Sequence, residues 1–87
     1  KEDNMQRVMT LVGRKRYAFS FEDGRTATGW ECHFTRDLIE GEGQEVYFGR
    51  ISDRDCPVHF VVGDKYIVVS DKPQGKLMAF LPVAVTD

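Results

Sequence analysis

Apolar and polar residues alternate in short runs along most of the chain, and turn-forming residues separate these runs at regular intervals. Alternation indicates β-strands, because successive side chains of a strand point to opposite faces. The runs are also rich in β-branched and aromatic residues, which strands favour. Five strands are therefore predicted, over residues 5–21, 26–35, 45–51, 65–70 and 76–85.

No stretch keeps the apolar period of an α-helix. The best helical candidate is one short turn near 35–40, where Thr35 could serve as the N-cap. Turn signals fall between the predicted strands. Asp23-Gly24 is the strongest of them, since an Asp-Gly pair between two β-rich runs is typical of a tight hairpin. Pro82 indicates an edge position or the end of the last strand.

Two long strands joined by a hairpin, with a longer connection before the third, suit a small barrel. Closure removes the exposed edges that an open sheet of this size would have. The sequence thus predicts an all-β fold, a small five-stranded OB-fold-like barrel, with an SH3-like barrel as the alternative. Gly13 and Gly29, inside the long strands, are expected to mark bulges or sharp bends. The chain is interpreted as one domain, 1–87, with residues 1–4 as a disordered or artificial tail.

The first predicted strand concentrates positive charge and aromatic rings in the stretch GRKRYAFSF. Odd-numbered and even-numbered residues of this stretch lie on opposite faces. Phe19 and Phe21 are expected to point into the barrel, which leaves Arg14 and Arg16 on the outer surface. An extended polyanion could lie across that surface. Alternatively, the two arginines only keep the strand soluble and block edge pairing.

Charge is distributed unevenly along the chain, although its net value of −2 is close to zero. Residues 5–36 hold six basic and three acidic side chains, whereas residues 37–57 hold two basic and six acidic ones. This asymmetry is compatible with a cationic face opposite an anionic edge. A mixed, solvated surface is the alternative interpretation.

The combination of aromatic and basic residues recurs in the second and third predicted strands. Trp30 follows Gly29, and Tyr47 lies close to Arg50. Exposed rings stack on the bases of single-stranded nucleic acid while cations hold its phosphates. The ten aromatic residues are more than so small a core is expected to use, so some are predicted to be exposed. Whether Trp30 and Tyr47 lie in the core or are partly exposed stays open.

No catalytic or metal-binding motif is present, and the sequence predicts neither an enzyme nor a cofactor. Cys32 and His33 are adjacent, so in a strand they would point to opposite faces and could not easily share a metal ion. Cys32 and Cys56 are too few for a secreted disulfide scaffold, which favours the reducing cytoplasm. No apolar run approaches the roughly 18 residues of a membrane-spanning segment.

Four stretches carry a resemblance to a known family, VGRK, TGWECHF, VGDKYIVV and GKLMAFLPV, and the resemblance covers the chain from about residue 8 to residue 83. In this order the chain resembles the gene V-like single-stranded DNA-binding proteins of phages, plasmids and integrated conjugative elements. The resemblance implies an OB-fold barrel, a homodimer, and cooperative coating of single strands with little sequence preference. It directs attention to Arg14, Lys15, Arg16, Tyr17, Arg25, Tyr47 and Arg50. The chain departs from the family in its acidic connection, residues 37–45.

Two functions are therefore carried forward. The first is non-enzymatic, largely sequence-independent binding of single-stranded DNA, or RNA, during replication or transfer of a phage or mobile element. The alternative is a protein-interaction module, SH3-like or a phage accessory protein, that uses the acidic connection 37–45. If the protein binds single-stranded DNA, replication or transfer proteins are candidate partners of the acidic connection. The nucleic-acid-binding residues predicted are Arg14, Lys15, Arg16, Tyr17, Arg25, Trp30, Tyr47 and Arg50.

Overall fold

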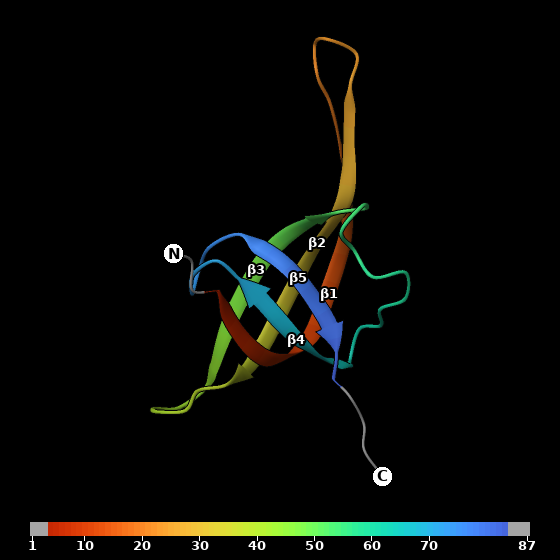
Figure 1. Ribbon diagram of the computed structural model, residues 1–87. Coiled ribbons are helices and arrows are strands. Elements are labelled where there is room, and N and C mark those ends of the chain that lie inside the picture. Colours follow the sequence, from red (N-terminus) through yellow and green to blue (C-terminus); the bar gives the residue numbers. More distant parts are fainter. Residues whose placement is uncertain (1–3, 84–87) are drawn as a thin grey trace.

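The computed structural model describes residues 4–83, which form five antiparallel strands (Figure 1). The strands are β1 (Met5–Ser20), β2 (Thr26–Asp37), β3 (Gln44–Ser52), β4 (Lys65–Ser70) and β5 (Leu77–Pro82). All five predicted strands are confirmed, and β5 ends at Pro82. The end of the last prediction, residues 84–85, and most of the expected tail lie outside the described residues.

The helical turn considered near 35–40 does not form. Residues 35–37 instead continue β2, and a loop follows them. The described part of the chain holds no helix that could span a bilayer.

The long strand β1 lies at the centre of the sheet, whose strand order is β3-β2-β1-β4-β5. Its second half pairs with β2, and its first half pairs with β4. The connection of residues 53–64 carries the chain from β3 to the far side of β1, which makes a Greek key of the first four strands. This is the order of a partly open, OB-fold-like barrel. No ladder of hydrogen bonds joins β3 to β5.

The barrel is filled by aromatic and aliphatic side chains from all five strands and from the 53–64 connection. Phe80 is central, because its ring packs edge-to-face against Phe34, Phe60 and Tyr66 at centroid distances of 5.3–5.4 Å. Such pairs contribute about 0.5–1.5 kcal/mol each beyond the area they bury. The buried apolar residues are Met9, Leu11, Cys32, Phe34, Tyr47, Ile51, Phe60, Tyr66, Val68, Leu77 and Phe80.

A β-bulge at Val12 reverses the two faces of β1. Leu11 pairs with Phe34 and Gly13 pairs with the next residue back, His33, so Val12 is an extra residue in the ladder. Before the bulge the odd-numbered side chains point into the core, and after it the even-numbered ones lie on the core side. The turn before β4 binds the bulge, since Leu11 donates to the Asp64 carbonyl and accepts from the Gly63 amide.

The expectation that Phe19 and Phe21 point into the barrel is wrong, because the bulge lies between them and the buried Leu11. The two residues are 45% and 48% exposed. The prediction that Gly13 marks a bulge is confirmed. Gly29 marks no irregularity of the ladder. It is instead a point of close approach, described below.

A buried arginine joins β3 to the turn between β4 and β5, where the barrel lacks a ladder. The Arg7 side chain is 2% exposed, and its Nη1 lies 2.6 Å from Oε2 of Glu45 on β3. Its Nη2 donates to Oγ of Ser70 and to the carbonyl of Pro73. The hydrogen bond from Arg36, and then that from Arg7, lowers the pKa of Glu45. Side-chain contacts of Arg7 therefore join β3 to the β4–β5 turn where no backbone hydrogen bonds do so.

Gly29 admits no larger side chain. A Cβ atom there would lie 2.2 Å from the Ile51 carbonyl oxygen and 2.6 Å from the Tyr17 hydroxyl. We therefore expect Gly29→Ala to destabilise the fold by about 1–3 kcal/mol in urea unfolding, the usual cost of overpacking. Gly13→Ala is the matched control, because its Cβ would meet only His33 at 3.8 Å or more. Equal unfolding midpoints for the two variants would contradict the packing described here.

Candidate nucleic-acid interface

The outer face of β1, β2 and β3 carries two groups of aromatic residues, the aromatic rows, one lying across β2 and β3 and the other along β1. In the first row His33 of β2 pairs with Phe48 of β3, and their ring centroids are 4.8 Å apart. In the second, Tyr17 and Phe19 of β1 lie together with centroids 5.3 Å apart. Tyr17 lies over Gly29, its cross-strand partner, so the glycine leaves room for the ring. Phe19 and Phe48 are each 45% exposed.

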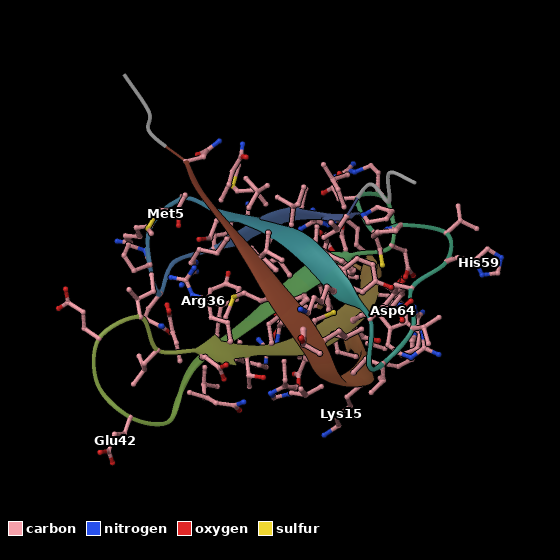
Figure 2. The ribbon with its side chains drawn as sticks, turned by 90° about the horizontal axis from the view of Figure 1, so that it is seen from below. Met5, Lys15, Arg36, Glu42, His59 and Asp64 are labelled. Atoms are coloured by element: carbon pink, nitrogen blue, oxygen red, sulfur yellow. The ribbon has the colours of Figure 1, made fainter. Side chains whose placement is uncertain are left out.

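A charged row lies between the two aromatic rows. Lys15, Glu31 and Arg50 are directly opposite one another on the three strands. Lys15 projects into solvent from β1 (Figure 2). Nε of Arg50 donates to Oε2 of Glu31 at 3.0 Å. Two cations and one carboxylate leave this row with a net positive charge.

The spacing of the rows follows from the strand repeat. His33 pairs with Gly13 and Gly29 pairs with Tyr17, so the aromatic rows are four positions apart along β1. At about 3.3 Å per residue this is roughly 13 Å, with the charged row midway. Rings at both ends and cations between them form a surface on which bases could stack and phosphates could be neutralised.

Arg14 and Arg16 lie on the opposite face of β1, where they hold the 53–64 connection. Arg14 donates to the Phe60 carbonyl at 3.0 Å, and its guanidinium lies over the rings of Trp30 and Phe60. Arg16 makes two hydrogen bonds to the Asp53 carboxylate, at 2.6 and 3.1 Å, which lower the pKa of Asp53. Both arginines thus have internal partners.

Trp30 is half-buried on this same face. The Arg14 and Arg16 guanidinium carbons lie 4.8 and 5.1 Å from the centroid of its ring, and the Phe60 ring packs perpendicular to it. Its ring is therefore engaged with the protein itself rather than open to a base.

Three of the residues predicted for binding, Lys15, Tyr17 and Arg50, come together on the outer face. Arg25 lies at the tip of the β1–β2 hairpin, which projects beyond the barrel (Figure 1), and it pairs with Asp23 at 2.6 Å. The sequence left open whether Tyr47 is exposed or in the core, and the structure buries it. It points into the core opposite Phe34, and its hydroxyl donates to the Gly75 carbonyl.

Phe19, His33 and Phe48 belong to the outer face but were not among the residues predicted to bind. Two features of the sequence indicate that Phe19 and Phe48 lie on the outer face. Gly13 marks the bulge that turns Phe19 outward, and Phe48 alternates with a Tyr47 that is large enough to fill the core. Cys32 and His33 do point to opposite faces, because Cys32 is buried while His33 lies outside.

No reactive thiol or metal cluster accompanies this face. Burial raises the pKa of the Cys32 thiol to about 12, so it stays protonated at neutral pH. Burial also raises the pKa of Cys56, and both cysteines are free thiols. Among residues 4–83 no three His, Cys, Asp or Glu side chains gather closely enough to hold a metal ion.

Comparisons with protein-family models, with curated proteins and with solved structures found no match for this chain. The resemblance to gene V-like proteins therefore stays a prediction. Function is inferred from the side chains of the chain itself.

Arg14→Ala should loosen the 53–64 connection and expose Trp30, because it removes a charge-assisted hydrogen bond and a cation over the ring. We expect the Trp30 emission maximum to move to longer wavelength and iodide quenching to increase. Arg54→Ala, which removes an exposed arginine of the same connection, should leave both unchanged. Identical emission from the two variants would mean that Arg14 does not cover Trp30.

Proposed function

We propose that the protein binds single-stranded DNA, without enzymatic activity and largely without sequence preference, through the outer face of β1, β2 and β3. Base stacking on aromatic side chains is worth about 1–3 kcal/mol per base and tolerates any sequence, because every base has a π-face. Lys15 and Arg50 lie between the two rows of rings, where the phosphates of a strand crossing the face would pass.

The observation that carries this proposal is the exposure of Phe19 and Phe48 on one sheet face that also presents cations. Single exposed apolar residues are ordinary. Two ring pairs on either side of a positively charged row are a more specific arrangement. The rings match the base of a nucleotide, and the cations match its phosphate. The binding face of OB-fold barrels also includes strands 2 and 3.

The same face offers no feature that distinguishes deoxyribose from ribose, so RNA is a second candidate ligand. A role in replication or transfer of a phage or mobile element rests on the gene V-like resemblance. A reducing, cytoplasmic setting fits the two free thiols.

A protein-interaction function of the acidic connection is the second candidate. Ile39 is 84% exposed in the loop that joins β2 to β3, among the exposed carboxylates of Asp37, Glu40 and Glu42. Glu42 lies at the end of this loop, well away from Lys15 (Figure 2). An apolar tip surrounded by negative charge suits a basic partner, such as a replication or transfer protein.

Replacing Phe48 should weaken nucleic-acid binding. With fluorescein-labelled oligo(dT) at low salt, we expect Phe48→Ala to raise Kd about 5- to 150-fold, the loss of one stacked base. Val58→Ala is the control, because Val58 is 95% exposed in the 53–64 connection, away from the rings. Binding should also weaken with salt, by a log–log slope of about −0.7 for each phosphate contact.

Absence of binding at low salt would refute the proposal. Equal affinities for Phe48→Ala and Val58→Ala would place the ligand elsewhere. The double variant Glu40→Gln, Glu42→Gln should leave oligo(dT) binding intact. If the acidic connection instead binds a basic protein, the same double variant should abolish capture of that protein. Glu45 is left unchanged in this experiment, because it pairs with the buried Arg7.

We also propose a homodimer, built on an apolar row that crosses the outer face of β1, β4 and β5. Val8 pairs with Ile67, which pairs with Leu81, and both Val8 and Leu81 are about half exposed. Light scattering should give twice the 10.0 kDa mass of one chain. Val8→Lys should halve the mass, whereas Val58→Lys, in the 53–64 connection, should not. A monomeric wild-type protein would exclude this proposal.

A further inference from the structure

We propose that Glu31 is an internal competitor for phosphate: it holds Arg50 across the rings of Tyr17 and Phe19, and a bound strand must exchange a phosphate for this carboxylate. This inference rests on the proposed function, since it assigns a regulator to the same face. It concerns the charged row, in which one carboxylate lies between two cations.

The position of Glu31 makes it a fixed element of the face. Glu31 lies on the central strand of the three and is directly opposite both Lys15 and Arg50. Its side chain is only 18% exposed, whereas that of Arg50 is 52% exposed. The carboxylate is thus held close to the sheet, while the guanidinium is accessible and can turn toward an anion from solution.

The guanidinium of Arg50 also covers aromatic surface. Its central carbon lies 5.5 Å from the Phe19 ring centroid and 5.9 Å from that of Tyr17. Nε is fixed at the same time by the 3.0 Å hydrogen bond to Glu31. In the free protein, one side chain therefore occupies both a cation position and part of a stacking surface that a nucleotide needs.

Exchange of partners is feasible because an ion pair exposed on one side is weak. A phosphate offers Arg50 the same charge-assisted hydrogen bonds in bidentate form. When Arg50 turns to the phosphate, the Tyr17 and Phe19 rings are uncovered for a base. Glu31 is then left facing Lys15 across the strands. Breaking the Glu31–Arg50 ion pair costs free energy, so the carboxylate lowers the affinity for any nucleic-acid strand. This lower affinity favours reversible binding.

Glu31→Gln keeps the shape of the side chain and removes its charge. We expect this variant to bind oligo(dT) about 5- to 10-fold more tightly at low salt, with an unchanged salt slope, because Arg50 contacts a phosphate in both bound proteins. Glu42→Gln is the charge-matched control and should change the affinity less than about 2-fold, because Glu42 lies far from the face. In the Arg50→Gln background, Glu31→Gln should gain less than about 2-fold.

A second readout follows Arg50 directly. In ¹⁵N NMR spectra the Arg50 Nε–H signal should move when oligo(dT) is added to the wild-type protein, and Glu31→Gln should shift it before any ligand is added. Wild-type binding with no gain from Glu31→Gln, or an Arg50 signal that does not respond to oligo(dT), would overturn the inference alone. Equal gains with and without Arg50 would overturn it too, since Glu31 would then act only as bulk charge. No binding by any variant would overturn the proposed function instead.

Discussion

The extra residue that β1 accommodates at Val12 determines which of its side chains fill the barrel and which reach solvent. Without the bulge, the alternation that buries Met9 and Leu11 would continue and carry Tyr17 and Phe19 into the core side. With it, the two rings face outward, and Arg14 and Arg16 take the core side. The backbone groups of Leu11 are satisfied by the turn before β4, so this irregularity is tied to the Greek-key connection.

After the bulge, the two faces of β1 have different roles. On the core side, Arg14 and Arg16 attach the 53–64 connection by hydrogen bonds to Phe60 and Asp53. This attachment holds Phe60 and the Arg14 guanidinium against the ring of the half-buried Trp30. On the outer side no segment of the described chain covers the rings of Phe19 and Phe48, and the charged row remains accessible. The surface proposed to bind nucleic acid is thus one that the described chain leaves uncovered.

The sequence was sufficient to predict where the strands and the bulge lie, but not which side chains of β1 point to the core and which to solvent. Local alternation and turn residues define strands, and Gly13 inside a long strand indicates an irregularity. The parity after a bulge depends on its register with a partner strand, and that register is a long-range property. This is why Phe19 was expected inside. The partners of Arg16 and Arg14 lie 37 and 46 residues away, so their pairing could not be read from neighbouring residues.

The most direct test of the account is an NMR titration of the ¹⁵N-labelled protein with unlabelled oligo(dT), read residue by residue. Amide shifts should be largest at Lys15, Tyr17, Phe19, His33 and Phe48, on the outer face. The indole signal of Trp30 and the amides of 53–64 should move little. Shifts confined to Trp30 and the 53–64 connection, or to the 38–43 loop, would contradict the assignment of the outer face as the binding surface.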